Sequence, residues 1–184
     1  MRRRPAALIV ALMTASCGDD AGGRTPTDRS PGVGTSVRDD ASLFRLITET
    51  DSLSGYALFP NVAEFTEGRL NGSEAHRPIV RVILNAVAVG ALQNGRLPTN
   101  SQFPTGSVIV KEVRTRADAT VTTYAVMYKD AGNTRAGNGW LWAEFAPSGA
   151  AGYSVSNRGA GCTSCHQREL GPRNDLVRTF ERQR

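Results

Sequence analysis

Two cysteines and a histidine near the C-terminus have the types and spacing with the clearest chemistry. Cys162 and Cys165 are separated by two residues, and His166 follows the second cysteine directly. Thiols three positions apart share one turn of a helix, so both can bond to the same planar group while the adjacent imidazole binds its metal. A C-x-x-C-H segment therefore predicts one covalently attached haem c, with His166 as the iron ligand.

Two other uses of paired thiols fit this sequence less well. A structural zinc site needs four ligands, but the only other histidine is His76, and no cysteine lies near it. A thioredoxin-like C-x-x-C motif belongs in a β-α-β context near the start of a domain, which is missing here. The third cysteine, Cys17, is accounted for by the N-terminal segment, so we expect no disulfide framework.

The residue on the other side of the iron decides what such a haem can do. Electron-transfer cytochromes often fill that sixth position with methionine or histidine, and the candidates here are Met127 and His76. Met127 lies in a strand pattern, where methionine is usually a core residue, and His76 more often has a structural or hydrogen-bonding role. We therefore expect an open sixth position that can bind small ligands.

The N-terminus has the pattern of an export signal. Arg2 to Arg4 are followed by an apolar run, residues 5–13, that is too short to span a bilayer. Small residues then precede Cys17, an arrangement that resembles a bacterial lipoprotein signal, although Thr14 stands where leucine is usual. We expect residues 1–16 to be removed and Cys17 to carry lipid on the periplasmic side of a membrane. Ordinary signal-peptidase cleavage is the alternative.

Composition and charge describe one ordinary globular domain behind a polar linker. The chain has 184 residues, 40% hydrophobic and 21% charged, with a net charge of +5. Three of the basic residues belong to the signal, and no basic stripe alternates with aromatic residues, so we expect no nucleic-acid binding. Residues 17–38 are almost devoid of apolar side chains and read as a flexible lipidated tether. Residues 39–184 are expected to form the haem-binding domain.

Apolar periodicity predicts the elements that must position the haem residues. Asp40 is expected to cap a helix with Leu43, Leu46 and Ile47 on one face, and residues 56–65 form a packed loop or a short helix. Strands are predicted at 78–84, 107–114, 119–129 and 140–146, and further helices at 85–92, 162–168 and 174–182. Consecutive strands without long intervening helices predict an α+β fold, a mainly antiparallel sheet with an N-terminal helix and C-terminal haem-attachment helices.

Two charged residues fall on apolar faces of the predicted strands. Trp140, Trp142 and Glu144 share one face, so Glu144 is either an exposed edge carboxylate or a pocket carboxylate with a raised pKa, suited to act as a general base. Lys111 likewise alternates with apolar residues. It is either an ordinary edge lysine or a group that faces a pocket.

Several segments together resemble the cytochrome P460 and cytochrome c′-beta family. They are residues 103–112, 126–129, 139–145, 162–166 and 175–177, with His76, the strand after it and Asn85 upstream. The resemblance covers roughly residues 56–180. It implies a mainly antiparallel β fold, commonly a homodimer, with a five-coordinate haem held by the proximal histidine.

The resemblance also implies two possible activities. Cytochromes P460 oxidise hydroxylamine and handle nitric oxide, using a lysine bonded to the haem edge and a distal carboxylate, which correspond by position to Lys111 and Glu144. In the c′-beta branch an apolar pocket with phenylalanines binds gases, and the candidates here are Phe59, Phe65 and Phe103, which are otherwise core residues.

We therefore expect a haem oxidoreductase acting on hydroxylamine or nitric oxide, with a periplasmic electron-transfer protein as partner. A non-catalytic nitric oxide binder or a small electron-transfer cytochrome c is the alternative. Arg81 is a candidate partner for a haem propionate.

Overall fold

The computed structural model describes residues 37–68, 75–168 and 174–183. The chain divides into residues 1–32 and 33–184, and only the second unit is discussed below. The predicted signal segment, the lipidated Cys17 and most of the predicted tether lie outside the described residues. Among the residues that are described, no helix is both long and apolar enough to cross a membrane.

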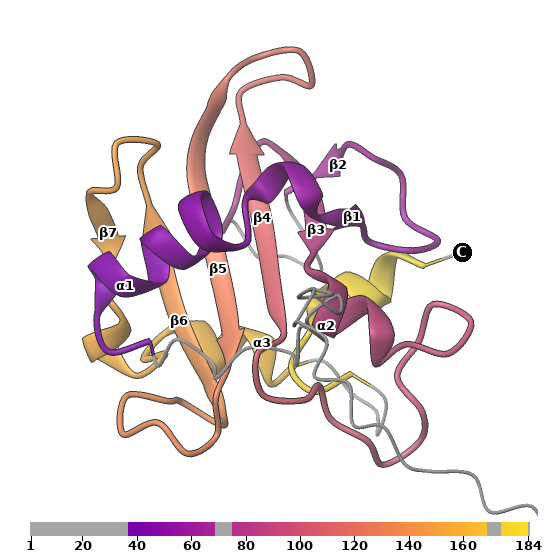
Figure 1. Ribbon diagram of the computed structural model, residues 1–184. Coiled ribbons are helices and arrows are strands. Elements are labelled where there is room, and N and C mark those ends of the chain that lie inside the picture. Colours follow the sequence, from indigo (N-terminus) through magenta and orange to yellow (C-terminus); the bar gives the residue numbers. More distant parts are fainter. Residues whose placement is uncertain (1–36, 69–74, 169–173, 184) are drawn as a thin grey trace, which may run out of the picture. The chain divides into compact units, whose positions relative to one another are not determined.

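An antiparallel sheet forms the centre of the domain (Figure 1). Its strands run in the order β1-β3-β4-β5-β6-β7, with β2 also paired to β3. Their bounds are β1 (Ala57–Leu58), β2 (Thr66–Glu67), β3 (Ile79–Leu84), β4 (Val108–Arg114), β5 (Val121–Lys129), β6 (Trp140–Phe145) and β7 (Ala151–Tyr153). The predicted α+β class and the four long strands are confirmed. The strands β1, β2 and β7 were not predicted, because two or three residues are too few to show an alternating pattern.

Short helices surround this sheet. They are α1 (Asp40–Arg45), which continues as a π-helical segment η1 (Leu46–Thr50), α2 (Ala86–Gly90) and α3 (Cys162–His166), with 3-10 turns η2 (Leu53–Gly55), η3 (Val155–Asn157) and η4 (Arg178–Arg182). The predicted helix over 174–182 thus begins only at residue 178, because the residues before it form a turn.

The cap of α1 differs by one residue from the prediction. Asp39, rather than Asp40, caps the helix by accepting the backbone N–H of Ser42 at 2.8 Å, and the Ser42 hydroxyl binds back to the N–H of Asp39. This reciprocal capping box satisfies two free N–H groups at once, which explains why Asp39 rather than Asp40 caps the helix. Asp40 instead accepts the N–H of Val155 at 2.8 Å and ties α1 to η3.

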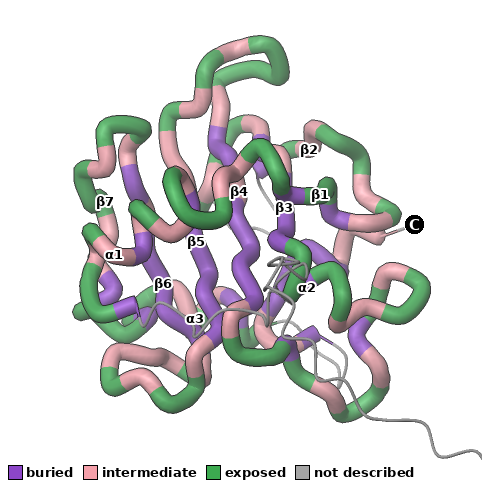
Figure 2. The backbone as a smooth tube through the Cα atoms, viewed as in Figure 1, coloured by how far each residue is buried: buried purple, intermediate pink, exposed green. Residues whose placement is uncertain are grey.

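The two faces of the sheet bury different layers. One face packs against α1 and η1, which cross it in Figure 1, and this layer includes Leu43, Ile47, Val110, Leu141 and Phe145. Val37, within the predicted tether, is only 2% exposed in the same layer, so packing begins before residue 39. The opposite face packs against the C-terminal segments, in a layer that includes Ile109, Met127, Trp142, Val177 and Phe180. Figure 2 shows the long strands buried between the layers.

Asn85 makes four side-chain hydrogen bonds that join α2, the start of β4 and the end of η1. Its side-chain oxygen accepts the backbone N–H groups of Ala88 and Val108, each at 3.0 Å. Its amide donates to the carbonyl of Gly106 at 2.9 Å and to Asp51 at 3.1 Å. Because Asn85 is only 5% exposed, water cannot replace these bonds if the side chain is removed.

We expect Asn85→Ala to lower the free energy of unfolding by about 2–4 kcal/mol, because it removes a helix cap and leaves buried polar groups unpaired. Urea unfolding of the haem-loaded protein measures this. The control is Asp39→Ala, which removes an exposed cap and should cost about 1 kcal/mol. Equal losses for the two variants would contradict the assigned role of Asn85.

Candidate functional site

A row of three residues crosses the sheet on the face opposite α1. Lys111 of β4 pairs with Ala125 of β5, which in turn pairs with Glu144 of β6. Paired residues in an antiparallel sheet point to the same face, and neighbouring strands lie roughly 4.8 Å apart. The methyl group of Ala125 therefore leaves open space between the longer side chains of Lys111 and Glu144.

This open space is part of a cavity of about 260 Å³ between the sheet and α3. Cys162, Cys165 and His166 line it from α3, and Lys111 and Glu144 line it from the sheet. All five residues that the sequence predicts for the haem domain therefore face one cavity. The predicted shared face of Trp140, Trp142 and Glu144 is also found, because the first two pack in the same layer and Glu144 borders it.

The loop before α3 allows that helix to lie close to the sheet. Gly159 has φ of +73°, and a Cβ atom there would lie 2.5 Å from Cδ1 of Trp142. A larger residue would therefore push α3 away from β6, as well as being strained in this backbone conformation. Glycine at this position therefore follows from the close approach of the loop to the Trp142 side chain.

His166 is held in the orientation that an iron ligand needs. Its Nδ1 lies 2.7 Å from the carbonyl oxygen of Leu176, and its ring packs edge-on against Trp142 with 4.7 Å between centroids. A carbonyl only accepts hydrogen bonds, so Nδ1 carries the proton and Nε2 keeps its lone pair. Burial, with the nearby charge of Lys111, lowers the pKa of His166 to about 3, so the ring is neutral.

The two thiols differ in their surroundings. Nη1 of Arg178 donates to Sγ of Cys165 at 3.0 Å, whereas burial raises the pKa of the Cys162 thiol. Arg178 also lines the cavity and binds Glu181 through its Nε at 2.8 Å. The sequence did not identify Arg178 as a site residue, because its position depends on the turn before η4, which has no sequence signal.

Lys111 places a buried amine at the cavity. It forms no hydrogen bond or ion pair with another described residue, and what exposure it has is toward the cavity. Burial, together with the charges of Arg182 and Arg178, lowers the pKa of Lys111 to about 8. The chain has only two lysines, Lys111 and Lys129, beside many arginines. Lysine can lose its proton near neutral pH and arginine cannot, so the amine at position 111 is chemically distinctive.

Glu144 also faces this cavity, and the pKa of its carboxyl group is raised. Burial raises its pKa, and the charge of Lys111 opposes the shift. Oε1 of Glu144 lies 3.6 Å from Nδ1 of His76, too far for a hydrogen bond. Burial, with Lys111, lowers the pKa of His76 well below its usual value, so this imidazole is neutral. Glu144 is therefore not neutralised by His76 and can accept a proton from a group in the cavity.

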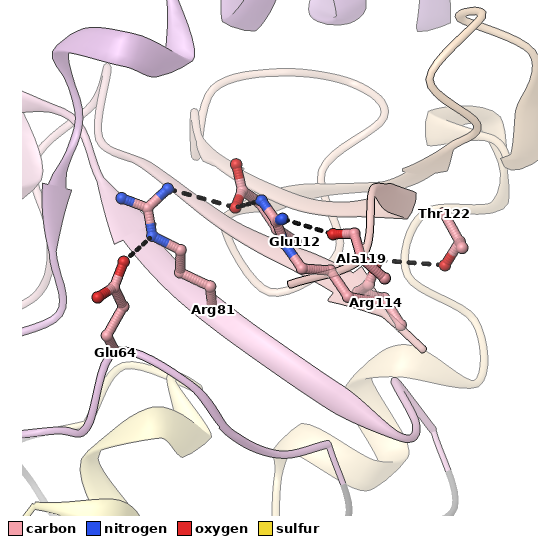
Figure 3. A network of polar contacts seen from close by, with 7 residues as sticks. Glu64, Arg81, Glu112, Arg114, Ala119 and Thr122 are labelled. Atoms are coloured by element: carbon pink, nitrogen blue, oxygen red, sulfur yellow. Dashed lines mark hydrogen bonds and ion pairs between the residues drawn. The ribbon is translucent and has the colours of Figure 1, made fainter. Parts of the chain in front are cut away.

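Arg81 does not reach the cavity, so its predicted pairing with a propionate is not supported. Its guanidinium lies 3.3 Å from Glu64 and 3.4 Å from Glu112 on the face of the sheet opposite Lys111 (Figure 3). Glu112 also accepts from Arg114 at 2.9 Å. These charges form a separate polar network at one end of the sheet.

None of the three phenylalanines proposed as pocket lining borders the cavity. Phe59 and Phe103 pack in the core, where Phe180 contacts both rings with centroid distances of 5.0 and 6.2 Å. Phe65 lies under the guanidinium of Arg114, 5.7 Å away. Phe59 and Phe103 are therefore core residues, the alternative that the sequence analysis gave, and Phe65 packs against Arg114.

Comparison with known proteins assigns the family. The cytochrome P460 family model matches residues 63–178, more than half of the 184-residue chain. The chain therefore belongs to the cytochrome P460 family, and the resemblance inferred from its sequence segments is confirmed. Membership makes it a haem-binding cytochrome. No curated protein matches the chain.

The residues around the cavity fit a haem that is attached covalently through two thiols. Two thiols and a neutral imidazole on one helical turn supply the attachment and ligand atoms, and Arg178 supplies a cation for an acidic group. The described residues contain no group of three or more His, Cys, Asp or Glu side chains that could hold a metal ion by themselves.

Proposed function

We propose that this protein oxidises hydroxylamine, and binds or converts nitric oxide, at a single haem c. Cys162 and Cys165 would attach the haem, and His166 would bind its iron. One observation carries the proposal. Lys111, a buried amine that pairs with no described residue, and Glu144, a carboxylate with a raised pKa, face the same cavity as the C-x-x-C-H residues. A site that only carried electrons would need neither group.

Glu144 would act as the proton acceptor. Conversion of hydroxylamine to nitric oxide releases three protons and three electrons, and the bound haem supplies the redox chemistry and the site for the nitrogen ligand. The protons require a base beside that ligand. Glu144 is suited to this task because burial moves its pKa toward neutral pH while its nearest imidazole, on His76, is neutral.

Lys111 would be joined covalently to the haem edge, where its nitrogen would replace a hydrogen on a haem carbon. The two hydrogens lost, one from nitrogen and one from carbon, would leave as protons, and a peroxide oxidant would take up the two electrons. Its lowered pKa leaves part of the amine neutral near physiological pH, and only the neutral amine has the lone pair needed to form a bond. No described residue competes for that amine through an ion pair. Such a link would fix the haem against β4 as well as against α3.

An open sixth position fits the surroundings of Met127, one of its two alternative ligands. His76 and Met127 both line the cavity. Met127, however, is 7% exposed and packs between Ile109 and Trp142, its neighbours across the sheet. We therefore propose that a substrate nitrogen, rather than Met127, occupies that position.

A non-catalytic nitric oxide binder or an electron-transfer cytochrome remains the second candidate. The presence of His76 and Met127 in the cavity favours it, since either could ligate iron. The c′-beta form of this alternative has less support, because Phe59, Phe65 and Phe103 do not border the cavity.

Turnover and spectra of the purified haem-loaded protein distinguish these functions. The proposal expects hydroxylamine-dependent reduction of an artificial electron acceptor and a red-shifted Soret band in the ferrous state. Nitric oxide binding without turnover would favour the binding protein. A methionine-ligated spectrum that disappears in Met127→Ala would favour electron transfer.

We further propose that the protein is anchored by lipid on Cys17 at the periplasmic side of a bacterial membrane, where it would pass electrons to a periplasmic electron-transfer protein. A homodimer is also proposed, from the family resemblance. The N-terminal residue pattern supports the anchor. Cys17→Ser is expected to move the protein from the membrane fraction to the soluble periplasmic fraction. Release of the unchanged protein by osmotic shock alone would contradict lipid anchoring.

A further inference from the structure

A buried ion pair lies behind the candidate site without lining its cavity. Nζ of Lys129 lies 2.9 and 2.8 Å from the two carboxylate oxygens of Asp175, and these side chains are 4% and 5% exposed. The carboxylate also accepts the backbone N–H of Phe103 at 2.9 Å. The carbonyl of Asp175 accepts Nε1–H of Trp140 at 3.0 Å. Asp175 is therefore fixed through both its side chain and its backbone.

The fixed residue begins an unusual stretch of backbone. Asp175 and Leu176 have φ of +40° and +67°, the left-handed region. A branched apolar residue such as leucine adopts it only where surrounding contacts impose it. The turn is closed by Val177, whose N–H donates to the carbonyl of Asn174 at 2.7 Å. The contacts of Asp175 are the ones positioned to hold this conformation.

The strained turn supplies the hydrogen-bond acceptor for His166. The carbonyl oxygen of Leu176 accepts the Nδ1 proton of His166 at 2.7 Å. If Asp175 were released, the turn could relax to negative φ and the carbonyl would rotate away from the imidazole. The ion pair thus acts on His166 through a single peptide group.

We infer that Lys129 and Asp175 are positioning residues that set the electron-donating strength of His166. A histidine that donates its second ring proton to a carbonyl is a more basic metal ligand. A more basic ligand favours ferric over ferrous iron and lowers the reduction potential. This inference rests on the proposed ligation of iron by His166 but not on hydroxylamine turnover. Lys129 and Asp175 also lie in two segments, 126–129 and 175–177, that carry the family resemblance without an assigned role.

The arrangement is more specific than stability alone requires. Replacing a buried ion pair with apolar residues is often neutral or stabilising, so such a pair needs another explanation. Here one carboxylate receives donors from β5 and from the loop at Phe103, while its own peptide receives Trp140 of β6. The three anchors converge on the residue next to the carbonyl that binds His166.

The test compares Asp175→Ala with Asp175→Asn in the full-length haem protein. Reduction potential and the iron–histidine stretching band in the ferrous resonance Raman spectrum are measured. In Asp175→Ala we expect the ferrous-to-ferric ratio at a fixed potential to rise tenfold, which corresponds to a reduction potential higher by about 59 mV for a one-electron couple. The frequency of the iron–histidine band should fall. Asparagine keeps an acceptor oxygen and tolerates positive φ. Asp175→Asn should therefore stay close to the unchanged protein in both measurements.

Glu112→Gln is the matched control for loss of a buried negative charge. Glu112 is a buried carboxylate that pairs with Arg81 and Arg114 on the opposite face of the sheet (Figure 3). This variant should lower stability but leave the iron–histidine band unchanged, because it does not contact the turn that holds His166.

Two results overturn the inference: equal shifts in Asp175→Ala and Asp175→Asn, which indicate an effect of charge alone, or no shift in Asp175→Ala. If Asp175→Ala does not fold, the same two measurements are compared between Lys129→Met and Lys129→Arg. A shift only in Lys129→Met supports positioning, while equal shifts or none in the two variants overturn it. Absence of an iron–histidine band in the unchanged ferrous protein rejects a five-coordinate iron ligated by His166, and with it the proposed open site. A normal band that does not respond to the variants rejects the inference alone.

Discussion

Glu144→Gln is expected to lower hydroxylamine turnover by roughly 10²–10⁴-fold while nitric oxide binding persists. Glutamine has nearly the same shape and keeps an acceptor oxygen, but it cannot take up a proton. Turnover requires protons to leave the bound nitrogen ligand, whereas binding of nitric oxide does not. The change should therefore appear in the catalytic rate of the haem-loaded protein, with its Soret band and its nitric oxide complex unchanged.

The pH dependence of turnover provides a second readout for Glu144. Burial raises the pKa of this carboxyl, and a base works only when deprotonated. The rate should therefore fall as the pH drops through that raised pKa, at a higher pH than an exposed glutamate would give. Glu144→Gln should remove this acidic limb. If the limb remains in the variant, another group accepts the protons.

Glu112→Gln is again the appropriate control. Glu112 is adjacent to Lys111 in β4 but points to the other face of the sheet, where it joins the network with Arg81 and Arg114. Its replacement changes a buried carboxylate without touching the cavity, so turnover should be retained. Equal losses of turnover in Glu112→Gln and Glu144→Gln would indicate a general structural effect and contradict a specific role for Glu144.

Side-chain alternation explains why the sheet part of the site could be predicted. In β4 and β6 a charged residue lies on the same face as apolar ones, so Lys111 and Glu144 were expected either at an edge of the sheet or in a pocket, and both line the cavity. The strand register, which the sequence does not specify, then placed Ala125 between them. The spacing of Cys162, Cys165 and His166 needed no tertiary information beyond one helical turn.

The parts that sequence reasoning missed depend on contacts between distant segments. Phe59 and Phe103 are apolar in the same way as a pocket residue, and only packing against Phe180 shows that they belong to the core. Arg81 was assigned to the haem because its partner Glu112 is 31 residues away in sequence. The acceptor for His166 is a backbone carbonyl in a strained turn, and a carbonyl is present at every residue.

Lys111 is expected to be bonded to the haem, so that proteolysis yields one haem joined to two peptides, those containing Lys111 and Cys162–Cys165. The amine is partly neutral because its pKa is lowered to about 8. Bond formation should therefore become faster as the pH rises toward that value, since protonation blocks the lone pair. Mass mapping is unusually clear in this chain, because Lys129 is the only other lysine.

Lys111→Met and Lys111→Arg should both lose the link and the red-shifted Soret band. Arginine keeps the positive charge but cannot become a neutral nucleophile, so this pair separates the chemistry of the amine from its charge. Hydroxylamine turnover should fall roughly 10²-fold in both variants because the haem is less firmly positioned, while nitric oxide still binds.

Lys129 is the internal control for the cross-link. It is also a buried lysine, but its amine donates hydrogen bonds to both oxygens of the Asp175 carboxylate and does not line the cavity. Its peptide should be free of haem. If the Lys111 peptide of the unchanged protein were equally free of haem and the Soret band ordinary, the two lysines would be chemically alike. The main argument for an oxidase would then be lost, and the cavity would be better explained as a binding site for nitric oxide.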